Sequence, residues 1–405
     1  MEWSSATEPL RAELASALPE RPFEVRFWDG SALPSTSGNG PVFTARSPRA
    51  VAHALLAPGQ LGLSRAYVSG ELEVDDIDAV LRLLGDWTPP PIDGATQRRL
   101  MLGAVRAAGV MRPPRPPAIE LRPRGRRHSI ARDARAVRYH YNVSNDFFAL
   151  FLDASMTYSC AVFEDPSSDD EPLERAQERK LEMVCTKLAL QPGDRVLDVG
   201  CGWGSFPIHA ARRHGAHVVG ITLSEPQAAL ARERVTAAGV ADRVKIRVAD
   251  YREMRGERFD AIASIGMVEH VGKIQLNYYA ATLAGLLAPG GRLLNHGIAR
   301  LRHGEAEAGS FSERYVFPDA APTHLSRVLL ALERAGFVCE HVEGFAEHYA
   351  RTLGHWAARL DANAAEGERL AGAERMRVWR LYLRAARSGF QSGFTSIYQV
   401  RCRRA

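Results

Sequence analysis

Cysteines are few in this 405-residue sequence, and long apolar runs are absent from it. The five cysteines are scattered and no pair has the spacing of zinc ligands, so we expect reduced thiols, no disulfide framework and no metal site. No stretch approaches the roughly 18 uninterrupted apolar residues of a membrane-spanning helix. The N-terminal residues also lack the apolar core of a secretory signal. These absences predict a protein that stays in the cytoplasm.

Lysine is scarce as well, so arginine carries nearly all of the positive charge. Only four of the 52 basic residues are lysines, and the formal net charge is +5. The arginine excess can simply reflect a GC-rich genome. Nine arginines, however, lie between Arg112 and Arg138 against two acidic residues. This arginine stripe is expected to attract phosphates, either of nucleic acid or of anionic lipid headgroups.

The N-terminal third carries no nucleotide-binding fingerprint. Residues 1–90 predict a small α+β domain, with a strand in the alternating run 22–28, a helix between 47 and 59, and another that begins near 77. Residues 91–138 predict a basic connector rich in proline and arginine, in which 100–111 form an apolar helix. The remaining residues, 139–405, form the third region.

This third region alternates strands and helices. The expected strands are 195–199, 217–221, 244–248, 259–264, 291–295, 337–342 and 395–400, with helices such as 226–238 and 276–287 between them. Alternation of this kind predicts an α/β fold built on a doubly wound, mostly parallel seven-stranded sheet. The site of such a fold lies at the carboxyl ends of the strands.

A glycine loop follows the first of these strands, in the segment DVGCGWG at 198–204. Glycines there let the backbone approach a nucleotide-like ligand, and the candidates are NAD and S-adenosylmethionine (AdoMet). An NAD site needs an acid after the second strand, where this chain has Thr222, Leu223 and Ser224. AdoMet instead needs a carboxylate near the loop for its amino group, which Asp198 is expected to help position. Asp250 is expected either to meet the adenine amine or to cap a helix.

The chain resembles the class I AdoMet methyltransferases and, more narrowly, the cyclopropane-fatty-acyl-phospholipid synthase family. The matching segments follow in order along nearly the whole chain: GLSRAYVSG (62–70), YHYNVSNDFF (139–148), MTYSC (156–160), GITLSEPQ (220–227), DYR (250–252), GMVEHVG (266–272) and YVFP (315–318). Three positions depart from the family pattern. Asn142 replaces an aspartate, Gly297 replaces a threonine, and Ala386 stands where many members have a cysteine, which excludes thiol chemistry there.

The resemblance implies which residues hold the ligands. For AdoMet they are Tyr158, Ser159, Gly200, Gly202, Gly204, Thr222, Leu223 and Gln227, with Asp250, Tyr251 and Arg252 as further candidates. The family is thought to use a bicarbonate ion as the base, which here would be held by Cys160, Glu269, His296, Ile298 and Tyr315. Residues 1–90 would form the accessory domain of the full-length synthases, for lipid binding or oligomer formation.

Each candidate catalytic residue could also have a purely structural role. Cys160 suits a small buried position or a pocket wall better than a nucleophile. Glu269 can cap a helix, His296 can be structural, and Tyr315 can serve packing. Their joint occurrence at the expected motif positions favours the interpretation as a site.

The resemblance predicts methyl transfer to the cis double bond of unsaturated phospholipid acyl chains through a carbocation. Proton loss from the new methyl group gives a cyclopropane, whereas a hydride shift first gives a 10-methylene branch, and the motifs suit both. We expect an enzyme that binds peripherally to the anionic surface of the membrane, at the inner face of the cell membrane. We expect no nucleic acid as partner, and the enzyme could assemble into a dimer or tetramer. A nucleic-acid methyltransferase guided by the arginine stripe is the remote alternative, and a catalytically inactive lipid-binding module is disfavoured because no candidate site residue is missing.

Overall fold

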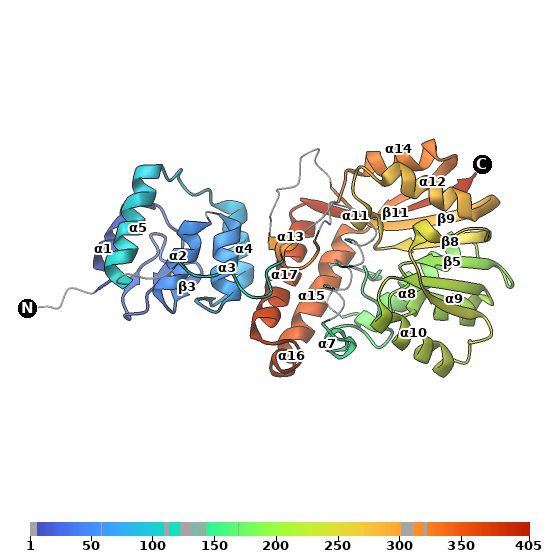
Figure 1. Ribbon diagram of the computed structural model, residues 1–405, viewed down its shortest axis with the longest axis horizontal. Helices are drawn as coiled ribbons and strands as arrows, with labels where there is room; N and C mark the ends of the chain where they lie inside the picture. Colours follow the sequence, from blue (N-terminus) through green and yellow to red (C-terminus); the bar gives the residue numbers. More distant parts are fainter. Residues whose placement is uncertain are drawn as a thin grey trace, which may run out of the picture. The chain divides into compact units, whose positions relative to one another are not determined.

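The computed structural model describes residues 6–57, 59–108, 113–121, 132, 135, 139, 143–168, 170–300, 311–318 and 322–405. These residues form two compact units (Figure 1). The N-terminal unit comprises Met1–Arg122, Glu307–Val316 and Gly372–Ser388. The C-terminal unit comprises Pro123–Ala306, Phe317–Ala371 and Gly389–Ala405. The predicted division of the chain at residues 90 and 138 stays a prediction.

The N-terminal unit has a small α+β fold, as the sequence predicts. Its sheet has the order β2-β1-β3-β4, with β1 parallel to β3 and the other neighbours antiparallel. Leu10, Phe27 and Leu100 are among the side chains that fill its core. The elements are α1 (Glu8–Ala17), β1 (Glu24–Arg26), β2 (Ala32–Leu33), β3 (Val42–Ala45), α2 (Pro48–Leu56), α3 (Gln60–Val68), β4 (Leu72–Val74), α4 (Ile77–Asp86), α5 (Gly94–Ala108), α13 (Phe311–Tyr315) and most of α17 (Ala373–Gln391).

Helix α17 joins this unit although it follows the first strand of the unit by some 350 residues in the chain. Arg377 of α17 forms an ion pair with Glu73 of β4. About two helical turns further on, Arg384 pairs with Asp78 of α4 at 3.2 Å. Two arginines on one face of α17 therefore tie it to acidic residues of the small domain.

The C-terminal unit is built on a seven-stranded sheet with the order β10-β11-β9-β8-β5-β6-β7. The five strands from β9 to β7 are parallel, and β11 runs antiparallel to both of its neighbours. The strands are β5 (Arg195–Val199), β6 (His217–Thr222), β7 (Val244–Val248), β8 (Phe259–Ile265), β9 (Leu287–Arg300), β10 (Phe337–Gly344) and β11 (Thr395–Arg404). The predicted doubly wound, mostly parallel sheet is confirmed.

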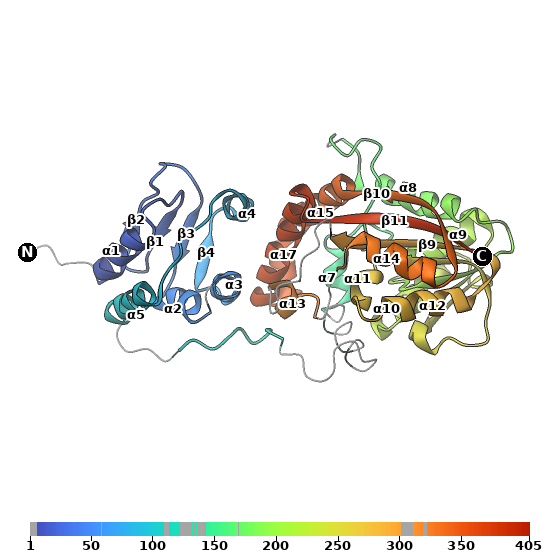
Figure 2. The same ribbon diagram turned by 90° about the horizontal axis from the view of Figure 1, so that it is seen from above.

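Helices cover both faces of this sheet (Figures 1 and 2). Successive strand residues point to opposite faces, so Val196 of β5 packs in the core shared with α8, α9 and α10, whereas Leu197 packs in the core shared with α11, α12 and α14. The helices are α7 (Asn145–Ala149), α8 (Leu173–Lys187), α9 (Ser205–His214), α10 (Glu225–Ala237), α11 (Val268–Val271), α12 (Leu276–Leu286), α14 (Leu325–Arg334), α15 (Ala346–Ala362) and α16 (Ala364–Ala371), with the 3-10 turn η1 (Tyr251–Glu253).

The membrane-related expectations concern segments that are described in part. Among the described residues, no helix has both the length and the apolar character needed to cross a bilayer. Six of the nine arginines of the arginine stripe lie outside the described residues, and so does Asn142. The expected role of the stripe in docking therefore stays a prediction.

Candidate functional site

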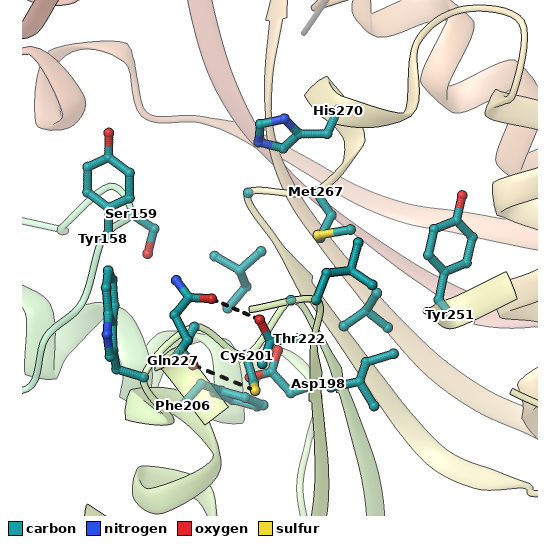
Figure 3. Close-up of a pocket in the computed structure, with 18 of the residues that line it drawn as sticks. Tyr158, Ser159, Asp198, Cys201, Phe206, Thr222, Gln227, Tyr251, Met267 and His270 are labelled. Atoms are coloured by element: carbon teal, nitrogen blue, oxygen red, sulfur yellow. Dashed lines mark hydrogen bonds between the residues drawn. The ribbon is translucent and has the colours of Figure 1, made fainter. Parts of the chain in front are cut away.

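A cavity opens in the C-terminal unit at the carboxyl ends of parallel strands (Figure 3). Its volume of about 160 Å³ far exceeds the roughly 10–15 Å³ that a single buried water needs. Loops after β5, β6, β7 and β8 line it, together with the segment 156–159. The predicted cofactor residues that line it are Tyr158, Ser159, Gly200, Gly202, Thr222, Leu223, Gln227, Asp250, Tyr251 and Arg252. The cavity thus lies where a parallel sheet is expected to bind its ligand.

The glycine loop after β5 forms the floor of the cavity. A Cβ at Gly200 would lie 2.6 Å from Met267 Sδ, so a side chain is excluded there. At Gly202, whose φ is +54°, a Cβ would meet nothing within 4 Å, so the space beside this residue is open. Gly204 does not line the cavity. A Cβ there would lie 3.3 Å from Ala231 Cβ, so this glycine allows close packing against α10.

Thr222 and Gln227 form a hydrogen-bonded pair at the end of β6 (Figure 3). The Thr222 hydroxyl donates to Gln227 Oε1 at 2.8 Å. This bond fixes the orientation of the amide, because its oxygen is the accepting atom. The Gln227 NH₂ group is therefore left to donate to a ligand in the cavity. The residues at the end of β6, Thr222 to Ser224, include no carboxylate, and Glu225, the first residue of α10, is exposed and does not line the cavity, which disfavours the ribose contact of an NAD site.

Asp250 and Arg252 pair with each other at the end of β7. The Asp250 carboxylate accepts hydrogen bonds from the Arg252 backbone N–H at 2.9 Å and from its guanidinium at 2.6 Å. Asp250 thus caps the turn η1 and also lines the cavity. The cap interpretation is confirmed, and a contact with adenine stays a prediction.

Two buried charged residues, Lys180 and Asp198, also line the cavity. The Lys180 ammonium donates to Ser159 Oγ at 2.9 Å, and burial lowers its pKa to about 8. Burial raises the pKa of Asp198 to about 7. Asp198 Oδ1 is buried without a hydrogen-bond partner among the described residues. The cavity therefore contains a buried amine and a buried carboxyl group, and burial disfavours the charged form of each.

Sequence reasoning missed Lys180, although a signal was present. Leu173, Ala176, Lys180 and Val184 repeat at helical spacing, and all four lie on the buried face of α8. Trp203 and His270 are further cavity residues that were not predicted as cofactor ligands. Burial lowers the pKa of His270 to about 4, so its imidazole is neutral at pH 7.

A second cluster of polar groups adjoins the cavity at Gly266. Glu269 of α11 is 8% exposed, and its carboxylate accepts a hydrogen bond from the Ile298 backbone N–H. Glu269 Oε1 lies 3.9 Å from the position of a Cβ at Gly266, which lines the cavity. Burial raises the pKa of Glu269 to about 7. Its Oε2 has no hydrogen-bond partner among the described residues.

His296 of β9 belongs to the same cluster, and its tautomer follows from its neighbours. Lys187 donates to Gln399 Oε1 at 2.6 Å, which turns the Gln399 NH₂ group toward His296 Nδ1 at 3.4 Å. Because Nδ1 accepts, the ring proton lies on Nε2. His296 Nε2 is buried and has no partner in the described part of the chain. Burial lowers the pKa of His296 to about 3, so the ring is neutral.

Cys160 reaches this cluster through Phe345. Its thiol donates to the Phe345 carbonyl at 3.8 Å, and the Phe345 ring lies 6.0 Å from the His296 ring. Cys160 is fully buried, and burial raises the pKa of its thiol far above the ordinary value. The thiol is therefore protonated and suits a wall of the site better than a nucleophile.

Tyr315, the fifth residue expected at the base, belongs to the N-terminal unit. Its hydroxyl donates to Glu120 Oε2 at 3.0 Å. Arg65 makes two hydrogen bonds of 2.7 Å to the same carboxylate. Arg65, Glu120 and Tyr315 thus form a largely buried network within that unit.

The departure at Gly297 has a structural explanation. A Cβ at this position would lie 2.2 Å from Val268 Cγ1 and 3.1 Å from Glu269 Oε2. The side chains of Val268 and Glu269 therefore occupy the space that a side chain at 297 would need. Any larger residue here requires α11 to rearrange.

The polar groups of the cavity fit AdoMet, and those of the cluster around Glu269 and His296 fit a bicarbonate ion. The open space at Gly202 and the partnerless Asp198 oxygen suit a ligand with a cationic amino group, as AdoMet has. The partnerless His296 Nε2–H can donate to a small oxyanion, and Glu269 can bind a hydroxyl of it. A bicarbonate ion has both kinds of group.

Comparison with known proteins gives an independent view of the chain. Residues 128–400 match the family described as mycolic acid cyclopropane synthetase. The chain is 38% identical to a probable fatty acid methyltransferase of Mycobacterium tuberculosis, over 96% of this chain and 92% of the relative. It is 32% identical to a tuberculostearic acid methyltransferase of the same species, over 93% and 87%. A crystal structure of a mycolic acid cyclopropane synthase complexed with SAH and CTAB superposes with a TM-score of 0.63 at 32% identity, covering 67% of this chain and 98% of that one.

Proposed function

Since the chain belongs to the mycolic acid cyclopropane synthetase family, whose members include AdoMet-dependent fatty acid methyltransferases, we propose that it methylates the cis double bond of unsaturated acyl chains in membrane phospholipids and gives a cyclopropane. The observation that carries this proposal is the juxtaposition of two sites. A cavity suited to AdoMet adjoins, at Gly266, a buried cluster that ends in two partnerless polar atoms.

The cavity residues would bind and orient the cofactor. When bound, AdoMet supplies an electrophilic methyl group. Gly200 and Gly202 allow the backbone to approach the ligand closely, and the Gln227 NH₂ group donates to one of its oxygens. Tyr158 and Trp203 line the cavity with aromatic surface that excludes water and favours a cationic centre.

The second cluster would hold the base that removes the proton released in the reaction. When the alkene carbon bonds to the methyl carbon, positive charge develops on the acyl chain, and loss of one methyl proton allows the ring to close. Cys160, Glu269, His296 and the Ile298 backbone N–H would hold a bicarbonate ion, which supplies the base. A neutral His296 can donate from Nε2 without adding a charge that would repel the cation. The expected role of Tyr315 in holding the bicarbonate ion stays a prediction.

A second product is supported by one comparison. The similarity to a tuberculostearic acid methyltransferase covers 93% of this chain, whereas that to the cyclopropane-fatty-acyl-phospholipid synthase of Escherichia coli covers 64%. A hydride shift before proton loss would give a 10-methylene branch from an oleoyl chain. The same two sites would serve this reaction, because both routes end with loss of a proton from the transferred methyl group, and the methylene route adds only a hydride shift from one former alkene carbon to the other.

We further propose that the enzyme acts in the cytoplasm at the inner membrane face, where its acyl substrate lies. The arginine stripe supports this docking through its excess of positive charge. Assembly into a dimer or tetramer belongs to the same proposal. A nucleic-acid methyltransferase guided by the stripe would bind RNA or DNA in a salt-sensitive way, which lipid binding without nucleic-acid binding would exclude.

The decisive experiment is incubation with AdoMet and phospholipids that carry monounsaturated chains, followed by mass spectrometry and NMR of the acyl product. We expect a gain of CH₂ and the upfield proton signals of a cyclopropane ring. Vinylidene proton signals would identify the methylene product instead. An unchanged acyl chain, with AdoMet bound and the protein folded, would refute the proposed reaction.

A further inference from the structure

Four side chains with metal-binding groups lie together between α8 and α9. Helix α8 supplies Glu182 and Cys185, and α9 supplies His209 and His214. The two helices pack against each other (Figures 1 and 2). None of the four residues lines the cofactor cavity. The proposed reaction therefore does not account for this cluster.

A single carboxylate already joins the two imidazoles. Glu182 Oε2 lies 2.9 Å from His209 Nε2, and Glu182 Oε1 lies 3.1 Å from His214 Nε2. One ring nitrogen of each histidine and Cys185 Sγ also lie within 4.8 Å of one another. In a tetrahedral zinc site, ligand atoms about 2.0–2.3 Å from the ion are about 3.3–3.6 Å apart. Side-chain rotations that move these atoms by about 1 Å would therefore bring all four groups into zinc geometry.

The burial of the cluster suits an ion that enters from solvent on one side. Cys185 is fully buried and belongs to the core on this face of the sheet. The side chains of His209 and His214 are 10% and 19% exposed, whereas that of Glu182 is 48% exposed. The thiol thus closes the site on the protein side, and the carboxylate side leaves an entry path for an ion.

The donor set of the cluster favours zinc over other divalent ions. Thiolates and imidazoles are good zinc ligands, whereas magnesium and calcium take oxygen ligands. Four protein ligands fill a tetrahedral coordination shell, which is typical of a structural zinc site and leaves no open position for catalysis. Cysteine spacing could not reveal this set, because it contains one cysteine and its ligands come from two helices.

We propose that Glu182, Cys185, His209 and His214 form a structural zinc site that ties α8 to α9. When the ion binds, Cys185 releases its thiol proton to solvent, and each imidazole binds through Nε2 and keeps its proton on Nδ1. No electron is transferred. The site departs from the expectation, based on cysteine spacing, that the chain binds no metal. It does not depend on the proposed function.

The ion would stabilise two elements that border the cofactor cavity. Helix α9 begins directly after the glycine loop, and α8 carries Lys180, which lines the cavity. An ion that binds only the folded protein shifts the unfolding equilibrium by mass action. Free zinc at about 100 times its dissociation constant should therefore raise the melting temperature by about 5–10 °C.

Titration of the untagged, chelator-treated full-length protein tests the proposal, with Zn²⁺ followed by calorimetry and Co²⁺ by absorption spectroscopy. We expect one ion of either metal per chain, and for cobalt a thiolate-to-metal charge-transfer band in the near ultraviolet. Removing a group that only orients a metal ligand costs about 10- to 100-fold in affinity, so His214→Gln should lose at least about 100-fold. Cys185→Ala should abolish the charge-transfer band.

His217→Gln and Cys339→Ala are the matched controls, because each removes the same chemical group outside the cluster. Both should bind zinc as wild type does. Absence of zinc binding by wild type at micromolar concentrations would overturn the proposal and leave Glu182 as a hydrogen-bond acceptor for the two histidines. Equal zinc affinity of His214→Gln and wild type would also overturn it, as would a cobalt complex without the thiolate band. If Cys185→Ala does not fold, His214→Gln still decides, since this residue lies partly exposed at the end of α9.

Discussion

Replacing Glu269 with glutamine should remove activity and, at alkaline pH, stabilise the fold. The Glu269 carboxyl is buried, and burial raises its pKa from 4.5 to about 7. The folded protein therefore keeps this proton up to about pH 7, whereas the unfolded chain releases it near pH 4.5. Stability is lost as the pH rises through this interval, and the loss is complete above about pH 7. At 1.36 kcal/mol per pH unit, it amounts to about 3 kcal/mol.

Glutamine avoids this loss because it is neutral at every pH. Glu269→Gln should therefore be more stable than wild type by up to about 3 kcal/mol at pH 8, or roughly 6–12 °C in melting temperature. At pH 5 the gain should fall below about 1 kcal/mol. Turnover should decrease by about 100-fold or more, since the variant lacks an ionisable group at the base. Thermal unfolding at both pH values, together with a product assay, measures the two effects.

A matched control is Glu257→Gln, which should behave in the opposite way. Hydrogen bonds from Arg247 hold the pKa of Glu257 below its ordinary value, so neutralising it should cost stability at pH 8. A gain in stability of Glu269→Gln that is no larger at pH 8 than at pH 5 would show that burial does not raise the pKa of Glu269. Wild-type turnover in this variant would show that Glu269 takes no part in the reaction.

Three further outcomes are expected. Gly202→Val places a β-branched residue at a φ of +54°, which costs stability, and its side chain would enter the cavity, so variant protein that folds should show no AdoMet binding by calorimetry, and wild-type affinity would contradict the assignment. Removing bicarbonate from the buffer should slow wild type and adding it back should restore the rate, whereas a full rate without it would point to a side-chain base. Changing four arginines of the stripe to serine should weaken sedimentation of the protein with anionic vesicles at low salt; the four are Arg122, Arg124, Arg126 and Arg127. Equal sedimentation of this variant and wild type would show that the stripe does not serve membrane docking.

The parts of the site that sequence could predict are those that follow a strand directly. Gly202 and Gln227 belong to short motifs at strand ends, where alternation and turn residues are local signals. Lys180 was missed because a lysine on a helix usually faces solvent, and its burial depends on α8 packing against the sheet. The tautomer of His296 depends on Gln399, which β11 brings beside β9 across 103 residues of chain.

The domain arrangement was harder to predict for the same reason. The alternating pattern of the third region indicated its sheet, because each strand carries a local apolar signal. Nothing local in α17 shows that Arg377 pairs with Glu73, which lies 304 residues earlier in the chain. Likewise, the family motif around Tyr315 gave no sign that Glu120 accepts its hydrogen bond. Ion pairs between residues far apart in the chain produce no local repeating pattern by which a sequence could predict them.

The position of β11 has a consequence for biosynthesis. This strand follows all the others in the chain, yet it lies between β10 and β9 and is hydrogen-bonded to both. While the ribosome is still making the preceding residues, β9 and β10 therefore have no partner on the sides that later face β11. Exposed strand edges of this kind pair readily with other chains. The nascent protein thus passes through a stage that favours aggregation, and it should depend on chaperones until β11 is released and completes the sheet.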